Sequence, residues 1–220
     1  MLTGAGLREF ELSLPRTGGS LSSDVDQLLL LREMHHRFAN TLTSLFSQFR
    51  GDSQSFTSLQ IRELVDRHEA RIVAFGNLNR ALMVGATNAG ISVQDYVEHL
   101  CKSLSEALLE PIGVRCEVTA DAGTLPAVRC ELLGLVIAEL VTNSAKHAFP
   151  NRDDGVVRIR LLRREQSWVC IVSDNGEVAS QTPQGAGTKI LGQLIQLLGG
   201  RFAKNSGRYG TSALVAFPCD

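Results

Sequence analysis

The chain has 220 residues, of which 44% are hydrophobic and 20% are charged, and its formal net charge is −1. This composition is that of an ordinary globular protein with room for one large domain or two small ones. The near-neutral charge gives no support for a nucleic-acid partner or an anionic membrane, which favour an excess of basic residues. No apolar run approaches the roughly 20 residues that span a bilayer, and the first residues lack a signal-peptide profile. We therefore expect a cytoplasmic protein without membrane insertion.

The cysteines are scattered along the chain and never form a Cys-x-x-Cys pair. An odd number of cysteines without metal-ligand spacing is typical of reduced thiols that serve as small apolar side chains. The sequence therefore predicts neither a disulfide framework nor a zinc site. The five residues are Cys101, Cys116, Cys130, Cys170 and Cys219.

Two long helices are predicted after an N-terminal tail over 1–23 that contains Gly-Gly and Pro. Asp24 can cap the first helix, over about 24–50, and the second covers about 55–84. Both carry apolar residues at alternating steps of three and four, as in helices that pack in a bundle. A short polar break at 51–53 makes them an antiparallel hairpin. One hairpin leaves its apolar seam half covered, so we expect a homodimer in which two hairpins form a four-helix bundle.

The seam of the first helix comprises Leu28, Leu31, His35, Phe38, Leu42, Leu45 and Phe49. The seam of the second comprises Ile61, Val65, His68, Ile72, Phe75, Leu78 and Leu82. Three further helices and several strands are predicted after a linker at 85–90. The helices are expected over 91–109, 129–147 and 187–198, and the strands over 114–119, 156–162, 168–172 and 212–217. Mixed helices and antiparallel strands indicate a two-layer α+β sandwich with one face of its sheet covered. The predicted division is a tail (1–23), a hairpin domain (24–86) and an α+β domain (90–220).

Two adjacent histidines on the first predicted helix occupy different faces. His35 falls in the apolar seam, whereas His36 lies about 100° further round the helix, toward solvent. Glu33 and Asn40 lie on the same exposed face as His36. A nucleophilic imidazole needs an exposed neutral nitrogen and a partner that fixes its tautomer, or that orients the incoming phosphoryl group. Without further context, a solvated surface residue is the more common explanation of a single exposed histidine such as His36.

Polar residues interrupt the apolar helix over 129–147 in a single stripe: Glu139, Asn143, Lys146 and His147. A carboxylate, an amide and a lysine at this spacing can meet a hydrated Mg²⁺ and the phosphates that it bridges. The alternative is a half-exposed helix with a polar outer stripe. Buried polar groups must otherwise be paired or face a cavity.

Turn-forming residues follow the predicted strand 168–172. Asp174 stands at the strand end and precedes Asn175-Gly176, and Gly185-Ala-Gly187 opens the next helix. Glycine-rich backbone at a helix N-terminus can approach and hold phosphate, although turn glycines are common without such a role.

The segment around the histidine pair resembles the phosphoacceptor box of the second type of sensor histidine kinase, L-x-E-x-H-H-R-x-x-N-x-L. In that family the second histidine of the pair carries the phosphoryl group, which corresponds to His36. One departure is Ala39, where the family commonly has lysine. The matching residues are Leu31, Glu33, His36, Arg37, Asn40 and Leu42.

The later motifs resemble, in order and spacing, the ATP-binding domain shared by histidine kinases, DNA gyrase and heat-shock protein 90. The resemblance implies a histidine kinase-like ATPase sandwich of the Bergerat type that binds ATP and Mg²⁺. It implies that Asn143 is the magnesium ligand, that Glu139 assists proton removal, and that Lys146 and His147 lie close to the phosphates. It also implies that Asp174 accepts the adenine amino group, with Gly176 in the adjoining turn and Gly185 and Gly187 in the second glycine box.

Two functions are compatible with these motifs. The first is a histidine autokinase that phosphorylates His36 from Mg·ATP and passes the phosphoryl group to the receiver domain of a response regulator. The glycine boxes are thin, because Glu177-Val178 follows Gly176 and leucines are replaced at Ala186 and Thr188. They leave open the second function, an ATP-independent dimeric phosphotransferase between receivers. A third alternative is an unrelated ATP-binding scaffold that uses its bundle only to dimerise. The few residues before the first helix suggest that a separate sensor protein supplies the signal.

Overall fold

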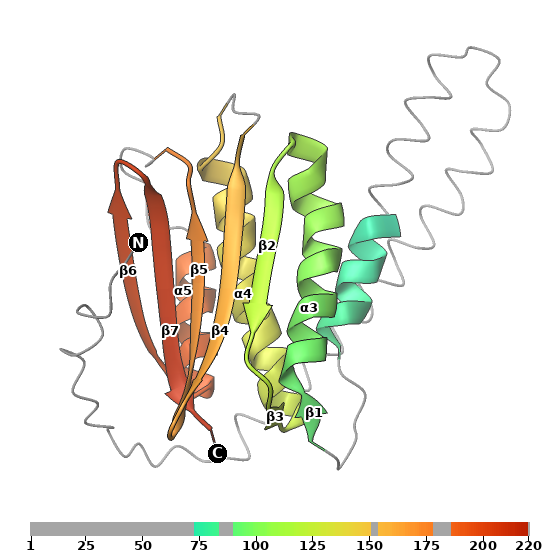
Figure 1. The fold of residues 1–220 in the computed structure, drawn as a ribbon, viewed down its shortest axis with the longest axis vertical. Coiled ribbons are helices and arrows are strands. Elements are labelled where there is room, and N and C mark those ends of the chain that lie inside the picture. Colours follow the sequence, from blue (N-terminus) through green and yellow to red (C-terminus); the bar gives the residue numbers. More distant parts are fainter. Residues whose placement is uncertain (1–72, 84–89, 151–153, 178–185, 220) are drawn as a thin grey trace, which may run out of the picture.

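The computed structural model describes residues 73–83, 90–150, 154–177 and 186–219. In these ranges a five-stranded sheet, in the order β2-β4-β5-β7-β6, carries its helices on one face (Figure 1). The strands are β2 (Arg115–Ala120), β4 (Val156–Arg164), β5 (Ser167–Asp174), β6 (Arg201–Gly207) and β7 (Gly210–Pro218). The covering helices are α3 (Val93–Leu104), α4 (Ala127–His147) and α5 (Ala186–Leu197). A short ribbon of β1 (Ile91–Ser92) and β3 (Thr124–Leu125) completes the fold. The predicted α+β sandwich is therefore confirmed.

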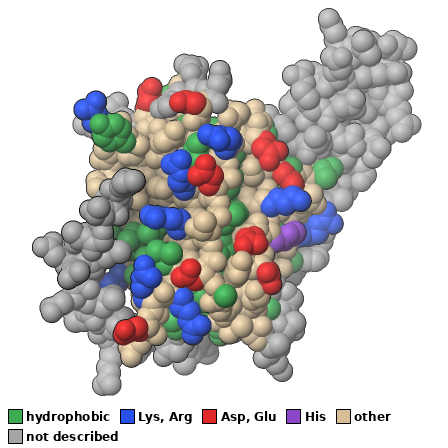
Figure 2. Space-filling view, viewed as in Figure 1, with side chains coloured by type: hydrophobic (Ala, Val, Ile, Leu, Met, Phe, Trp, Pro, Cys, Tyr) green, Lys and Arg blue, Asp and Glu red, His purple; other side chains and the backbone are tan. Residues whose placement is uncertain are grey.

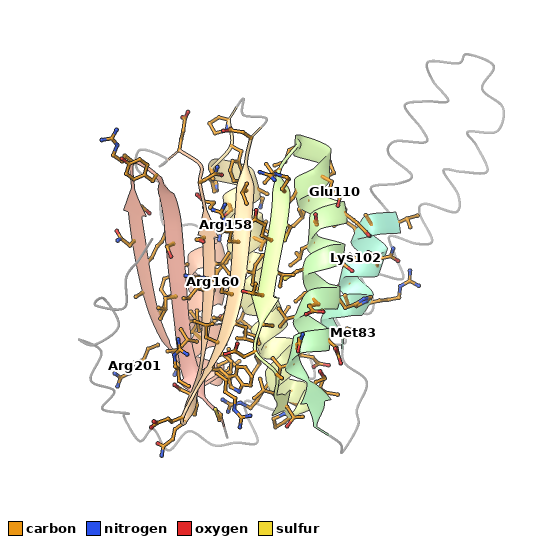
Figure 3. The ribbon with its side chains drawn as sticks, in the orientation of Figure 1. Met83, Lys102, Glu110, Arg158, Arg160 and Arg201 are labelled. Carbon is orange, nitrogen blue, oxygen red and sulfur yellow. The ribbon has the colours of Figure 1, made fainter. Side chains whose placement is uncertain are left out.

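Alternation of side chains along the strands separates the two faces of the sheet. On β4, Val157, Ile159 and Leu161 are fully buried, whereas Arg158 and Arg160 are exposed, as expected for a strand with one covered face. Both arginines project from the uncovered face in Figure 3, and Figure 2 shows basic and acidic side chains intermingled there. Arg158 pairs with Glu117 at 2.7 Å, but both side chains are 49% exposed. Such a pair contributes little to stability.

The helices bury nearly all of their apolar residues against the other face. The central helix, α4, is apolar on most of its circumference, as expected for a helix enclosed by other elements. Pro126 precedes its first turn, where a missing N–H does no harm. Ser92 caps α3 by accepting a hydrogen bond from the Asp95 backbone N–H at 3.4 Å. A π-helical turn (Ser105–Leu109) and a 3₁₀ turn (Glu110–Ile112) then lead to β2.

Two features of the sheet differ from the sequence-based prediction. First, β2 pairs with β4 in parallel, whereas the predicted strands were antiparallel. Parallel neighbours need a crossover of a dozen or more residues, which α4 supplies. Second, β6 was not predicted, because its sequence Arg-Phe-Ala-Lys-Asn-Ser-Gly is mostly polar and exposed. It pairs with β7 along its full length as an edge strand.

A helix over 73–82 ends on the same apolar core. Leu78, Ala81 and Leu82 are buried within the core cluster that α3 and α4 share, whereas Phe75 is 40% exposed. The last turn of the second predicted hairpin helix therefore packs against the α+β domain. The rest of the predicted hairpin, with its proposed four-helix bundle, lies outside the described residues. Within the described ranges, no helix combines the length and the hydropathy needed to cross a membrane.

Candidate nucleotide site

The carboxylate of Asp174 is held at the end of β5 by three donors from separate segments. Its Oδ1 atom accepts the backbone N–H of Gly176 at 3.2 Å and that of Thr211 at 3.0 Å. Its Oδ2 atom accepts the hydroxyl of Ser144 at 2.8 Å. Asp174 and Ser144 are each only 9% exposed. A carboxylate that accepts hydrogen bonds from three separate segments is fixed in orientation.

Backbone segments around Asp174 approach one another so closely that only glycine fits at two positions. A Cβ at Gly176 would overlap the carbonyl oxygen of Ala148, at the end of α4. A Cβ at Gly210 would overlap the carbonyl oxygen of Asp174, and Gly210 also has a positive φ of 117°. The N–H of Glu177 donates to the Ala148 carbonyl at 2.8 Å. The end of α4, the β5 turn and the start of β7 are thereby locked together.

Asn175 connects the same turn to the start of β4. Its Oδ1 atom accepts the Val156 N–H at 2.7 Å, and its Nδ2 atom donates to the Asp154 carbonyl at 3.2 Å. These bonds tie the turn after β5 to the start of β4. Asp174 is therefore set in a rigid part of the fold, as a binding group requires.

The predicted polar stripe of α4 forms as the sequence indicated. Glu139 and Asn143 are half-buried, and the Asn143 Nδ2 atom donates to Glu139 Oε1 at 3.4 Å. Lys146 and His147 are exposed at the C-terminal end of the helix. Ser144, next to Asn143 in the chain, joins this helix directly to Asp174. The stripe and the strand-end carboxylate thus belong to one region.

These residues fit a magnesium–nucleotide ligand by their chemistry. Mg²⁺ is usually held by one or two protein oxygens together with phosphates and waters. Glu139 and Asn143 offer a carboxylate and an amide oxygen, and Lys146 offers a positive charge for phosphate. The described part of the chain contains no group of three or more His, Cys, Asp or Glu residues that could enclose a metal.

The glycine boxes are only partly described. Gly187 lies in the first turn of α5, at the kind of helix N-terminus that can approach phosphate, whereas Gly185 lies outside the described residues. The predicted acceptor group of His36, Glu33 and Asn40 also lies outside them. Their roles remain predictions.

Ser144 and Thr211 belong to the site, although no motif in the sequence identified them. Ser144 is one of few hydroxyl residues on an apolar helix, which was a usable signal. Thr211 contributes its backbone N–H, which no side-chain pattern can reveal. Both contacts join residues that are 30 or 37 positions apart in the chain.

A mixed sheet with helices on one face, whose strand-end carboxylate is bonded to the helix that carries the polar stripe, is the arrangement of the histidine kinase-like ATPase fold. Family models agree: residues 33–108 match a model described as histidine kinase, and residues 97–208 match one described as histidine kinase-like ATPase domain. The chain belongs to the histidine kinase family, as its motifs predicted.

Several proteins are similar to this chain. Blue-light-activated histidine kinase 2 of Erythrobacter litoralis is 26% identical over 197 residues, covering 86% of this chain and 56% of the relative. Sensor histidine kinase PdtaS of Mycobacterium tuberculosis is 25% identical over 147 residues, covering 66% of this chain and 29% of the relative. This chain therefore spans about half the length, or less, of these curated relatives.

A solved histidine kinase domain from an Erythrobacter litoralis blue-light activated kinase superposes with a TM-score of 0.57 at 22% identity. That alignment covers 80% of this chain and 96% of the solved one. The histidine kinase AdeS of Acinetobacter baumannii aligns with a TM-score of 0.50 at 14% identity, covering 84% and 96% of the two chains. At these identities, the likeness supports the fold alone.

Proposed function

We propose that the protein is an ATP-dependent histidine autokinase of a two-component system. The ATPase-like domain holds Mg·ATP, the γ-phosphoryl group passes to His36, and an aspartate in a receiver domain of a response regulator accepts it next. The observation that carries the proposal is the fixed, buried carboxylate of Asp174 beside the polar stripe of α4. Family membership supports the same reaction class.

Each candidate residue has a defined role in this proposal. The Asp174 carboxylate, already oriented by its donors, accepts a hydrogen bond from the adenine amino group. Asn143 ligates Mg²⁺, and Lys146 and His147 lie near the phosphates, where a positive charge offsets the charge of the transferring group. Glu139 assists removal of a proton from the acceptor. Gly176 and Gly187, with Gly185, let the backbone approach the nucleotide.

The acceptor side of the reaction is supported by sequence. His36 stands on the exposed face of its predicted helix, with Glu33 and Asn40 available to fix the tautomer of the imidazole. Transfer is then mainly a matter of positioning two reactants, because the protein contributes little covalent chemistry. We propose that the hairpin dimerises and that the protein acts in the cytoplasm, with its input supplied by a separate sensor.

The test is incubation of the full chain with radiolabelled ATP and Mg²⁺, followed by analysis of the labelled residue. We expect label on His36, loss of label in His36→Ala, and retention in the adjacent matched control His35→Ala. Calorimetry should show ATP binding that weakens in Asn143→Ala. If wild-type protein neither binds ATP nor becomes labelled, the autokinase proposal fails.

The sequence of the first glycine box supports a second candidate function. Its second glycine is absent, since Glu177-Val178 follows Gly176. We therefore propose, as the alternative, a phosphotransferase that takes the phosphoryl group for His36 from a phosphorylated receiver without ATP. Labelling of His36 from such a receiver, in protein that does not bind ATP, would select this candidate.

A further inference from the structure

The hydroxyl of Tyr96 lies where the predicted hairpin joins the ATPase-like domain. Tyr96 belongs to α3 and is only 8% exposed, and its hydroxyl donates to the carbonyl oxygen of Leu82 at 3.4 Å. Leu82 is the last residue of the helix over 73–82, and the final carbonyls of a helix have no partner within it. Burial raises the pKa of Tyr96, so the hydroxyl keeps its proton and remains a donor at neutral pH.

A glycine on the opposite helix leaves room for this hydroxyl. Gly134 lies within the 21 residues of α4, where glycine costs about 1 kcal/mol relative to alanine. A Cβ at Gly134 would overlap the hydroxyl oxygen of Tyr96 and would lie 3.2 Å from the Leu100 side chain. The helix thus has glycine, which destabilises it, at a position where a larger residue would displace the Tyr96 hydroxyl.

Buried apolar side chains of the helix over 73–82 add to the contact that the Tyr96 hydroxyl makes. Leu78, Ala81 and Leu82 are 8%, 6% and 8% exposed and share a core cluster with residues of α3 and α4. Val73 and Phe75, on the same helix, are 47% and 40% exposed. Figure 1 shows the helix alongside α3, and Met83 marks its lower end in Figure 3. The C-terminal end of the helix is therefore held on the ATPase-like domain, whereas apolar side chains at its described N-terminal end stay exposed.

We infer that Tyr96, with the space left by Gly134, is a positioning residue for phosphoryl transfer: it fixes the end of the second hairpin helix on the ATPase-like domain. The inference rests on the proposed function, because the orientation of this helix relative to the ATPase-like domain matters only if the nucleotide must meet a group on the hairpin. Small displacements of reacting groups cause large losses of rate. Tyr96 would act through the helix and not through contact with ATP.

The test compares Tyr96→Phe with Tyr209→Phe in the full chain. Tyr209 is the matched control, because the chain has only two tyrosines and this one is 79% exposed. In Tyr96→Phe we expect the rate of His36 labelling to fall roughly 3- to 10-fold, the equivalent of one net hydrogen bond. The Kd for ATP should stay within about twofold, since no nucleotide contact is removed. Hydrogen exchange should accelerate in the amides of 73–82, and Tyr209→Phe should match wild type.

A second pair of variants separates the hydrogen bond from packing. Gly134→Ala should lower both the melting temperature and the labelling rate, because its methyl group overlaps the Tyr96 hydroxyl. The double variant Tyr96→Phe/Gly134→Ala removes that overlap and should recover melting temperature relative to Gly134→Ala. Its labelling should stay at the level of Tyr96→Phe, because the bond to Leu82 is still missing.

Two results would overturn the positioning role. One is a Tyr96→Phe protein with unchanged labelling and unchanged exchange over 73–82. The other is parallel loss of labelling and ATP affinity, which would indicate general destabilisation. If wild type itself fails to bind ATP, the proposed function fails, and hydrogen exchange still decides whether Tyr96 holds the helix: acceleration supports this contact and its absence refutes it.

Discussion

Substitution of Asp174 by alanine or by asparagine distinguishes its part in the fold from its part in binding. Alanine removes the acceptor of three hydrogen bonds, and leaves the N–H groups of Gly176 and Thr211 and the hydroxyl of Ser144 without it. An unsatisfied buried donor costs about 1–3 kcal/mol. Because the three losses are coupled, we expect a total decrease of about 3–5 kcal/mol in the free energy of unfolding. That is a large part of the roughly 5–15 kcal/mol typical of a domain.

Asparagine keeps the shape of the side chain and most of these bonds. Its amide oxygen can take the place of Oδ1 and accept both backbone N–H groups. Its Nδ2 atom can donate to the Ser144 hydroxyl, which then accepts a hydrogen bond instead of donating one. We expect a loss of about 1 kcal/mol, since neutral acceptors form weaker bonds than charged ones. The amide N–H₂ then faces the adenine amino group, donor against donor. The affinity for ATP should fall roughly 10- to 100-fold.

Urea denaturation followed by circular dichroism measures the first quantity, and titration calorimetry with Mg·ATP measures the second. The contrast between the variants is decisive: Asp174→Asn should be nearly as stable as wild type yet bind poorly. Wild-type affinity in Asp174→Asn would show that the carboxylate is not the adenine acceptor. Wild-type stability in Asp174→Ala would refute the hydrogen-bond argument itself.

Three further predictions concern packing and thiol chemistry. Gly176→Ala should decrease the free energy of unfolding by about 1–3 kcal/mol, because its Cβ overlaps the Ala148 carbonyl; an unchanged urea midpoint would contradict this. Gly192→Ala should increase the free energy of unfolding by about 0.5–1 kcal/mol, since Gly192 lies within α5 and nothing lies within 4 Å of the added Cβ. Urea denaturation measures this change as well, and destabilisation would count against the described helix. At neutral pH, iodoacetamide should alkylate Cys116 before the buried thiols. A hydrogen bond from Cys101 lowers the pKa of Cys116, whereas burial raises the pKa of Cys170 to about 12. Peptide mass spectrometry measures this order, and earlier labelling of Cys170 would refute it.

Local patterns predicted most of the described elements. The apolar run over 129–147 predicted α4 within two residues of its start. The strands predicted over 156–162 and 168–172 flank a short polar turn, and they correspond to the antiparallel pair β4 and β5. The position of Asp174 at the end of its strand also followed from sequence, because a carboxylate and a glycine turn mark where an apolar strand stops. The resemblance to histidine kinases, carried by the motifs, was confirmed by the family models.

Other features had no local signal. The polar composition of β6 hid an edge strand that is held by its pairing with β7, and the pairing direction of β2 depends on the crossover through α4. Leu78 and Leu82 have the spacing of a bundle seam, yet they are buried against the ATPase-like core. Periodicity identifies which face of a helix is apolar, but it does not identify what that face contacts.

The sequence by itself determined the kind of residue available at each part of the site, because helix and strand periods place Asn143 in a polar stripe and Asp174 at a strand end. Only the tertiary structure decided how these residues are held. The Ser144 hydroxyl and the Thr211 N–H reach Asp174 from 30 and 37 residues away, and Tyr96 reaches the Leu82 carbonyl between two predicted domains. Such contacts depend on the packing of whole elements, whose geometry is set by the core and not by the residues that finally meet.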